Sequence, residues 1–436
     1  MATSTKLLDQ LCTLDHLYLA WKSLNKTNTR SFGLTGESLA EYKSNIDTNI
    51  KNLSEQIKSG NFRFSQTRPY LIAKDNGKFR PLQIPEVKDR VVLKGIALIL
   101  ERELSKLLLP GEGVSFAYQK GLGIQQALFK IKEYYDKGDV FIYEADIVDF
   151  FGTVNRDTLV KMICKELSDS SLNNLIESGI TPRVGGLDQI SEEHRYLFVD
   201  KGGIPQGNAL SPLFSNIYLS PFDEKMKAAG FHLVRYADDF VVMSPSVELA
   251  KKAYDESSKY LRDYRGLEIH ALSGDANSKT RIIDPRKDVF SFLSVSFDGT
   301  YLFPSIKKKD EFLDNIVSMC SLTEKPDVLK LLNKVKNSHD GWISTYIFTD
   351  VKRYFEEIDW VINTGLYKYL RFCGWKFQKK SLGKLPRKYR QRGEKYFASG
   401  ECLSDEQRKN SGIILSKEIY KLRISSKTKC QEPLKN

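Results

Sequence analysis

Residues 232–244 have the sequence HLVRYADDFVVMS, and this stretch decides the fold. Apolar residues flank the adjacent acids Asp238 and Asp239, which predicts two strands joined by a tight hairpin with carboxylates at its tip. An ordinary solvent-exposed Asp-Asp turn is the simpler interpretation. The apolar flanks argue against it, because they hold the tip on a buried sheet, where two adjacent anions are costly unless cations lie beside them.

A second acidic strand end occurs earlier in the chain. FIYEADIVDFF (141–151) is an apolar strand that carries Asp146 and, three residues later, Asp149. Carboxylates from two strands can hold two hard cations roughly 3.5–4 Å apart. Mg²⁺ suits such a site, because it accepts a few carboxylates and keeps its other positions for phosphates and water. The pattern predicts nucleotidyl transfer, in which one ion lowers the pKa of an attacking 3′-hydroxyl and the other steadies a triphosphate.

The expected elements around these strands alternate between helices and hairpins. Apolar stripes at helical spacing predict helices at 1–60, 86–109, 155–168 and 247–265. Paired apolar runs predict hairpins at 68–84 and 289–304, and a Gly-rich turn leads into a helix within 201–226. We therefore expect an α+β fold in three parts: a helical extension at 1–67, a mixed centre at 68–304, and a helical basic region at 305–436.

Composition restricts the class of protein. With 41% apolar residues the chain can build a core. It has no apolar run of the roughly 18 residues that a membrane span needs, so we expect no membrane partner, and its first residues show no leader pattern. The six cysteines and five histidines lack metal-ligand spacing, which disfavours a zinc site and favours the reducing cytoplasm.

The net charge of +12 is concentrated near the C-terminus. Residues 371–430 contain 17 Lys and Arg against 5 Asp and Glu, whereas the rest of the chain is balanced. Four aromatic residues interleave with these cations: Trp375, Phe377, Tyr389 and Tyr396. Cations neutralise phosphates and aromatic rings stack on bases, so the block predicts a nucleic-acid-binding surface. The alternative is a solvated, partly helical tail.

Six segments together resemble the motifs of a known family, and they occur in the order found in that family. They are AWKSLNKTNTRSFGLTGESLAEY (20–42), KDNGKFRPLQIPEVKDRVV (74–92), FAYQKGLGIQQAL (116–128), EADIVDFFGTVN (144–155), GIPQGNALSPLFSNIYL (203–219) and YADDF (236–240). On these motifs the chain resembles reverse transcriptases of the bacterial, group II intron-like lineage. The resemblance implies a right-hand polymerase fold, with fingers, an antiparallel palm sheet packed on helices, and a helical thumb.

The resemblance also implies roles for individual residues. Asp146 and Asp238 would be the principal ligands of two Mg²⁺ ions, for which Mn²⁺ could substitute, supported by Asp239 and the carbonyl of Ile147. The incoming nucleotide would be held by Lys74 and Arg80 on its triphosphate, Phe151 under its sugar, Gln206 and Gly207 under its base and the template, and Lys279 as the proton donor to pyrophosphate. The RNA-binding cations would be Lys384, Arg387, Lys388 and Arg390.

Four positions depart from the family pattern. Gly152 stands where Asp is common, Asn208 where Ser or Thr follows the Gln-Gly pair, Thr35 where Asp is usual, and Ser294 where the primer-grip hairpin has Gly. No departure removes a candidate metal ligand. They indicate a divergent subfamily.

The function implied is that of an RNA-directed DNA polymerase that makes cDNA from dNTPs on an RNA template. With the basic block, we expect a structured non-coding RNA as partner, and an oligomer is compatible with the sequence. Neither a Cys/His-rich endonuclease module nor a ribonuclease H segment is recognisable, which favours a standalone enzyme of the kind found in anti-phage defence. Two alternatives stay open: a group II intron-type maturase that assists splicing, and an RNA-dependent RNA polymerase.

Overall fold

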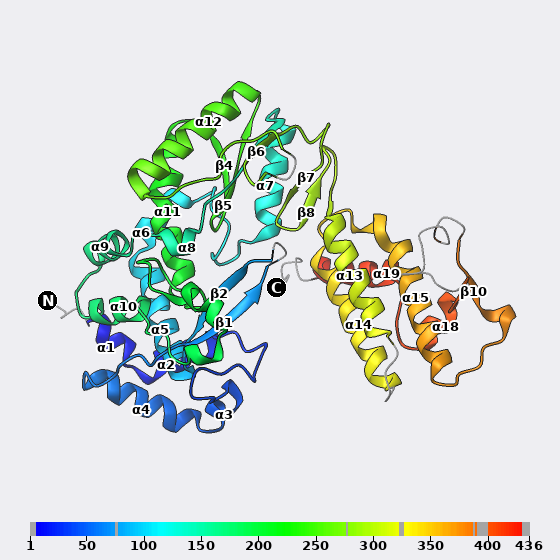
Figure 1. Cartoon of the computed structure of the whole chain (residues 1–436), viewed down its shortest axis with the longest axis horizontal. Helices are drawn as coiled ribbons and strands as arrows, with labels where there is room; N and C mark the ends of the chain where they lie inside the picture. Colours follow the sequence, from blue (N-terminus) through cyan, green and yellow to red (C-terminus); the bar gives the residue numbers. More distant parts are fainter. Residues whose placement is uncertain are drawn as a thin grey trace, which may run out of the picture. The chain divides into compact units, whose positions relative to one another are not determined.

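The computed structural model describes residues 6–74, 77–275, 278–321, 327–386, 389 and 400–429. The chain divides into two compact units, Met1–Ile283 and Asp284–Asn436 (Figure 1). The expected division into parts at residues 67 and 304 stays a prediction. None of the described helices combines the length and the apolarity that crossing a bilayer requires.

The first unit begins with the predicted helical extension. Its helices are α1 (Leu7–Leu11), α2 (Leu14–Ser23), α3 (Leu39–Ser44) and α4 (Ile46–Lys58). The Thr13 hydroxyl caps α2 by accepting from the backbone of His16, and Ser38 and Glu41 form a reciprocal capping box at α3. The apolar stripe of residues 39–57 is interrupted at Asn45, where one helix ends and the next begins.

A four-stranded antiparallel sheet forms the centre of the first unit. Its strands are β3 (Phe141–Asp146), β4 (His232–Tyr236), β5 (Asp239–Ser244) and β6 (Arg281–Ile283), in the order β4-β5-β3-β6. The predicted hairpin at 232–244 is confirmed, whereas the strand predicted at 141–151 ends at Asp146. The chain turns there, because Asp149 adopts a positive φ of 43° and opens the short helix α8 (Phe150–Thr153).

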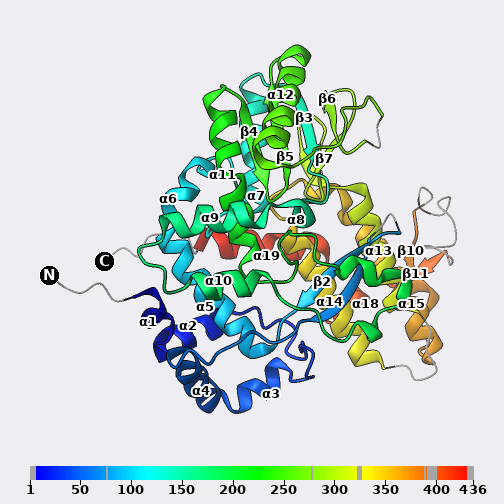
Figure 2. The same ribbon diagram turned by 60° about the vertical axis from the view of Figure 1, so that its left-hand side comes forward.

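The two faces of this sheet are covered by different helices. Tyr143, Phe240 and Val242 lie on the face packed by α11 (Ser211–Ala228) and α12 (Val247–Tyr260). The other face is covered by α7 (Ile124–Asp136), whose Tyr134 stacks on His232 (Figure 1; Figure 2). Side chains two residues apart in a strand share a face, so Asp146 and Asp239 project from the α7 face.

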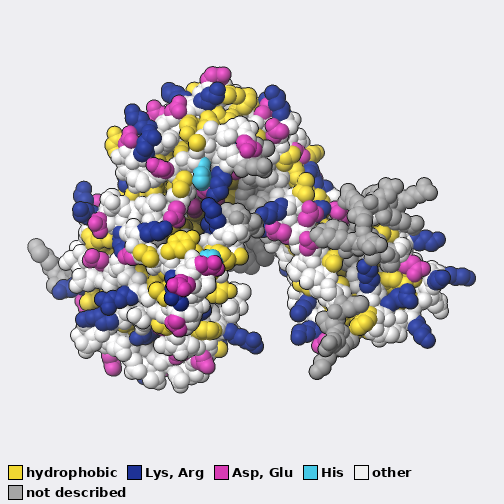
Figure 3. Space-filling model, viewed as in Figure 1, with side chains coloured by type: hydrophobic (Ala, Val, Ile, Leu, Met, Phe, Trp, Pro, Cys, Tyr) yellow, Lys and Arg dark blue, Asp and Glu magenta, His cyan; other side chains and the backbone are white. Residues whose placement is uncertain are grey.

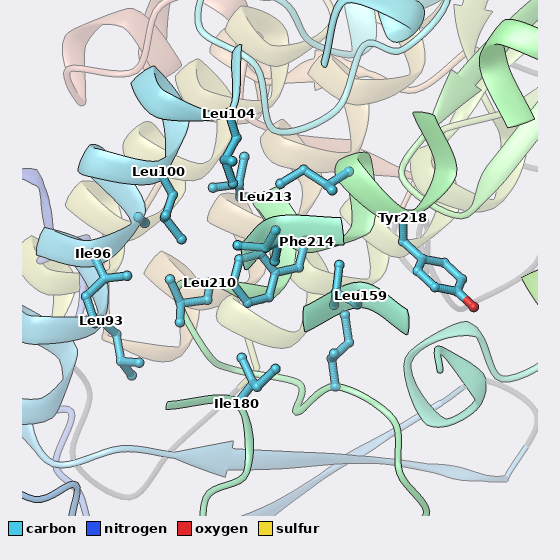
Figure 4. Packing of buried hydrophobic residues seen from close by; sticks show 14 of the residues in the cluster. Leu93, Ile96, Leu100, Leu104, Leu159, Ile180, Leu210, Leu213, Phe214 and Tyr218 are labelled. Carbon is cyan, nitrogen blue, oxygen red and sulfur yellow. The ribbon is translucent and has the colours of Figure 1, made fainter. Parts of the chain in front are cut away.

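The helical core beside the sheet is built from leucines and aromatic rings. It joins α5 (Val87–Glu103), α9 (Arg156–Glu166), α10 (Asn173–Ile180) and α11. Figure 4 shows Leu93, Ile96 and Leu100 of α5 directed toward Leu210 and Phe214 at the start of α11. This packing anchors the segment before α11, which carries the predicted Gln206 and Gly207. The short helix α6 (Ser105–Leu108) follows α5.

The predicted hairpin at 68–84 consists of β1 (Arg68–Ala73) and β2 (Phe79–Ile84). In the second unit, the predicted hairpin at 289–304 gains a strand and becomes a three-stranded antiparallel sheet, β7 (Phe290–Phe292), β8 (Val295–Phe297) and β9 (Leu302–Pro304). The remaining elements are α13 (Ile306–Met319), α14 (Val328–Thr345), α15 (Phe355–Phe372), β10 (Gly383–Lys384), β11 (Glu401–Cys402), α18 (Asp405–Asn410) and α19 (Ser416–Lys429).

A buried polar network ties the helices of the second unit together. Arg408 of α18 is fully buried and donates to Asp359 of α15 at 2.8 Å and to His339 of α14 at 3.3 Å. His339 Nε2 lies 2.8 Å from the hydroxyl of Ser416, which in turn donates to Asp359 at 2.8 Å. Both terminal nitrogens of the guanidinium are therefore paired, as is usual for buried polar groups.

Candidate active site

Strand register brings the two acidic strand ends together. Asp146 on β3 is the direct antiparallel partner of Asp239 on β5. Asp238 precedes it in the two-residue turn that joins β4 to β5, where Tyr236 pairs with Asp239. The three carboxylates that the sequence singled out thus share one end of the sheet, although 92 residues separate Asp146 from Asp238.

This cluster carries more negative charge than its surroundings favour. Burial raises the pKa of Asp238 above its usual value, and the charge of Asp146 raises it further. Burial, followed by the charges of Asp238, Asp146 and Glu144, raises the pKa of Asp239 to about 7. Partly buried carboxylates that repel one another in this way are stabilised by a cation held between them.

A lysine supplies one positive charge to the cluster. The ammonium of Lys279, in the segment just before β6, pairs with Asp146, and His270 Nε2 lies 3.6 Å from the same carboxylate oxygen. Across the part of the chain that the structure describes, no three Asp, Glu, His or Cys side chains are grouped as a complete metal site. The oxygen donors nevertheless fit a hard divalent cation, and such an ion would have to take the place of Lys279 on Asp146.

The backbone of Ile147 also faces this end of the sheet. Ile147 is buried and forms an antiparallel bridge with Ile269. The flanking bonds, from His270 N to Asp146 O at 3.3 Å and from Val148 N to Glu268 O at 2.8 Å, point toward residues 268–270. Carbonyls alternate in direction along an extended chain, so that of Ile147 points to the β5 side, where Asp238 and Asp239 lie.

A fully buried ion pair stabilises the acidic turn. Arg235 donates to both carboxylate oxygens of Asp223 on α11, at 2.7 and 2.5 Å, and to the side chain of Asn216 at 3.0 Å. Its guanidinium also donates to the carbonyl of Ala237 at 2.9 Å. Ala237 has a φ of +60°, a conformation that a non-glycine residue rarely adopts. Sequence reasoning missed this brace, since no local pattern pairs Arg235 with Asp223.

The predicted sugar-contacting ring, Phe151, lies in α8, five residues after Asp146 at the end of β3. It is half-buried, and its carbonyl accepts from the backbone of Ile204 at 2.8 Å. The two segments touch so closely that a Cβ on Gly203 would stand 2.1 Å from that carbonyl oxygen. A Cβ on Gly152 would stand 2.5 Å from a carboxylate oxygen of Asp149. Because Asp149 leaves no room for a side chain at position 152, Gly152 stands where the family commonly has Asp.

The glycine–glutamine segment is attached to the fingers hairpin. The backbone N–H of Gln83 on β2 donates to the Gln206 carbonyl at 2.9 Å. Gly207 has a φ of +97°, and a Cβ there would lie 3.0 Å from the Gln83 carbonyl oxygen. The lack of a side chain therefore lets the backbone of Gly207 lie close to β2. Asn208 is buried, donates to the Gly179 carbonyl at 2.6 Å and accepts from Leu210 N at 2.9 Å. A shorter Ser or Thr would not span both partners.

The two predicted triphosphate-binding cations are both exposed on the hairpin. Arg80 on β2 lies opposite Ile72 of β1, and its charge lowers the pKa of Asp238. Lys74 follows β1, and its backbone N–H donates to the Lys78 carbonyl at 2.8 Å. The charge of Arg80 thus acts on the acidic turn, whereas within the described residues no ion pair joins Lys74 to the carboxylates.

Two further departures have physical reasons. The backbone and hydroxyl of Thr35 donate to the two carboxylate oxygens of buried Glu86, at 2.8 and 2.9 Å. An Asp at position 35 would put a second carboxylate against Glu86. In the second unit, Leu293 and Ser294 have φ of +52° and +69° in the turn between β7 and β8. The family's Gly suits that conformation, and Ser294 adopts it with strain.

The predicted RNA-binding set is only partly described. Lys384 is exposed on β10, where it pairs with Glu401 of β11 in the strand register. Arg387, Lys388 and Arg390 lie outside the described residues.

Comparison with known proteins places this geometry in a family. Residues 72–293, which include β2 of the fingers hairpin, the four-stranded sheet and all three carboxylates, match the family described as reverse transcriptase (RNA-dependent DNA polymerase). The chain belongs to the reverse transcriptase family. This membership, with the antiparallel sheet packed on helices, confirms the right-hand polymerase fold that the sequence predicted.

Several relatives of this reverse transcriptase are known. It is 29% identical to the group II intron-encoded protein LtrA of Lactococcus lactis over 225 residues, 50% of this chain and 35% of LtrA. It is 26% identical to the protein YkfC of Escherichia coli over 210 residues, 46% of this chain and 51% of YkfC. The chain spans about a quarter to a half of the length of the curated relatives it matches.

Among solved structures, telomerase from Candida albicans in complex with a fragment of telomeric RNA is similar with a TM-score of 0.42 and 13% identity, covering 77% of this chain and 64% of that one.

Proposed function

We propose that this chain is an RNA-directed DNA polymerase that copies an RNA template into cDNA by two-metal nucleotidyl transfer. One observation carries the proposal: within the family segment, Asp146 is the direct strand partner of Asp239, next to Asp238 in the turn. Carboxylates gathered in this way, with the pKa values of Asp238 and Asp239 raised by burial and by neighbouring charge, are suited to hold divalent cations.

The metal-binding group would consist of Asp146, Asp238, Asp239 and the Ile147 carbonyl, with two Mg²⁺ ions that Mn²⁺ could replace. When bound, the ions lower the pKa of the primer hydroxyl and stabilise the charge on the triphosphate. The protein's own part is to hold the carboxylates in place, which the Arg235–Asp223 brace does through Ala237. Lys279 would release Asp146 and donate a proton to the leaving pyrophosphate.

The nucleotide would lie between the fingers hairpin and the palm. Arg80, with Lys74, would bind its triphosphate, because Arg offers planar paired donors and Lys a mobile charge. The Phe151 ring would exclude a 2′-hydroxyl from the sugar site. Gln206 and Gly207, fixed to β2 through Gln83, would support the base and the template.

The RNA partner would be held by the second unit, with the helical region beyond residue 304 acting as a thumb. On the face shown in Figure 3, Lys and Arg side chains are spread over the surface of this unit. Lys376, Lys379, Lys380 and Lys384 are exposed, and Trp375 beside them is 56% exposed. Such cations and rings favour a structured non-coding RNA as the bound partner.

We place the enzyme in the cytoplasm, in anti-phage defence. The five described cysteines are free thiols, which suits a reducing compartment. A second candidate is a splicing function of the maturase type, favoured by the similarity to an intron-encoded protein, LtrA.

The defence role predicts that cells expressing the chain resist phage and that cells expressing the Asp238→Ala, Asp239→Ala variant do not. Equal phage plating on both would remove it.

The decisive test of the activity is primer extension. Purified protein, an RNA template with an annealed DNA primer, dNTPs and Mg²⁺ should give cDNA, and EDTA should stop the reaction. The variant with Asp238→Ala and Asp239→Ala should fold and extend nothing, whereas Glu55→Ala, which removes an exposed acid on α4, should extend normally. Undiminished synthesis by the double variant would refute the metal site. RNA splicing without synthesis by the wild type would favour the maturase alternative.

A further inference from the structure

The segment before α7 forms an additional edge beside the acidic hairpin. Arg235 N donates to the Val114 carbonyl at 2.7 Å, and Phe116 N donates to the Arg235 carbonyl at 2.9 Å. Ser115 and Arg235 thus form a parallel bridge. Because the two segments run in the same direction, the residues that follow Phe116 reach the level of the turn that carries Asp238.

One buried side chain fixes this segment and the turn to the same point. Asn216 of α11 donates to the Ala117 carbonyl at 2.9 Å. Its side-chain oxygen accepts from Ser115 at 3.2 Å and from Arg235 at 3.0 Å. Since Arg235 also holds the Ala237 carbonyl, Ala117 and Ala237 are tied to one brace. The next residue, Tyr118, is therefore held at a fixed place relative to Asp238.

Tyr118 itself has an unusual conformation and an exposed ring. Its φ is +59°, in the left-handed region that costs a bulky residue energy, and its side chain does not join the core, since the residue is 54% exposed. Packing gives no reason for a tyrosine here. Backbone strain of this kind is concentrated at functional sites, where the surrounding structure enforces it.

Charges of both the fingers and the palm act on the phenol. Burial raises the pKa of Tyr118, the charges of Asp238, Tyr236 and Asp239 raise it further, and Arg80 lowers it. With the backbone of Tyr118 held at the level of Asp238, the phenol is within electrostatic reach of both the acidic turn and the cation expected to hold phosphates. A neutral O–H in this position can donate to an anionic oxygen without adding charge to the carboxylates.

We infer that Tyr118 is a nucleotide-binding residue, whose hydroxyl donates to the triphosphate of the incoming nucleotide beside Arg80. This inference rests on the proposed polymerase function and adds a specific phosphate contact to it. The ligand is the polyphosphate chain and not the base, since the phenol's charged neighbours are Arg80 and the metal-binding carboxylates.

Tyr118→Phe removes only the hydroxyl, and steady-state primer extension measures its effect. We expect the KM for a dNTP to rise about threefold to tenfold, the effect of one hydrogen bond, while kcat changes less than twofold. Inorganic tripolyphosphate, used as a competitive inhibitor, should lose affinity by the same factor. Tyr264→Phe, the same change at a 68% exposed tyrosine, should alter neither.

A second variant separates the hydroxyl from the ring. Tyr118→Asn tolerates the positive φ and should weaken tripolyphosphate inhibition at least as much as Tyr118→Phe. An unchanged KM in Tyr118→Phe, or a loss confined to Tyr118→Asn, would overturn the hydroxyl contact while leaving the polymerase proposal intact. If the wild type extends no primer, the polymerase proposal fails, and calorimetric titration of dTTP into wild type and Tyr118→Phe still decides the contact.

Discussion

The ammonium of Lys279 lies against the carboxylate of Asp146. The lysine that we expect to protonate pyrophosphate is therefore paired with a carboxylate that we expect to bind a metal ion. Its side chain is 58% exposed, so the pair is worth little and can exchange with an ion. The relationship links metal binding to the position of the proton donor.

Lys279→Ala should therefore have two opposite effects. The half-saturating Mg²⁺ concentration should fall about twofold to fivefold, because the ammonium no longer competes for Asp146, and kcat should fall at least about tenfold, because a proton donor is lost. Mg²⁺ titration of primer extension measures both. Lys259→Ala, an exposed lysine on α12, is the control. A kcat of Lys279→Ala as high as that of Lys259→Ala would contradict the assignment. A higher half-saturating Mg²⁺ concentration in Lys279→Ala would contradict it as well.

Phe151→Ala should open the sugar site to ribonucleotides. The dNTP-over-NTP preference in kcat/KM should fall about a hundredfold, equivalent to about 3 kcal/mol of lost discrimination. Phe151→Tyr retains the ring and should retain the preference, so it serves as the matched control. Competing dNTP and NTP incorporation on one template gives the measurement. Unchanged selectivity in Phe151→Ala would assign the ring to packing against Phe150, which it meets edge-on at 5.4 Å.

Much of the fold was predictable because its signals are local. The hairpins at 68–84 and 232–244 follow from apolar runs on both sides of turn residues, and the helices follow from apolar residues at helical spacing. The strand predicted at 141–151 came out too long, since its apolar run continues through Phe150, which belongs to the core as a helical residue.

The contacts that complete the site could not be predicted, because their partners lie far apart in the chain. The Arg235–Asp223 brace, the Thr35–Glu86 contact and the Lys279–Asp146 pair each join separate elements. Lys279 reaches Asp146 only because β6 pairs with β3, with Arg281 opposite Glu144. Tyr118 was missed for the same reason, as its backbone strain and its approach to the turn arise from tertiary structure.

The raised pKa of Asp239 makes stability dependent on pH and on metal. Its pKa is about 7 in the folded protein against about 3.9 in an unfolded chain. Between these values the folded protein retains a proton that the unfolded chain releases, so the free energy of unfolding falls as pH rises, by about 2–4 kcal/mol without metal.

Chemical denaturation at pH 5 and pH 8 in EDTA measures this fall. Asp239→Asn should largely remove it, whereas Asp263→Asn, at an exposed position, should leave it unchanged. Saturating Mg²⁺ should restore stability at pH 8, because the ion replaces the proton. Identical pH dependence in wild type and Asp239→Asn would show that this carboxyl does not share the cluster's charge.

The Arg235–Asp223 pair should be essential for both stability and activity, and a double variant can separate the two effects. Asp223→Ala leaves a fully buried guanidinium without its counter-charge, which should cost about 3–5 kcal/mol of unfolding free energy. Asp223→Leu combined with Arg235→Met removes both charges and should recover most of that stability. The double variant should still extend primers poorly, because nothing then holds the Ala237 carbonyl. Full activity in it would show that the turn needs no brace.

The exposed lysines after α15 should carry the salt dependence of RNA binding. Replacing Lys376, Lys379 and Lys380 by Ala should weaken binding of a structured RNA and reduce the slope of log K against log salt by about 2, since each lost phosphate contact retains its counterion. The matched control replaces Lys251, Lys252 and Lys259 on α12, which are equally exposed and remove the same charge. Fluorescence anisotropy at several salt concentrations gives both slopes. If the two triple variants lose affinity equally, the effect reflects net charge alone, and the RNA-binding surface must lie elsewhere.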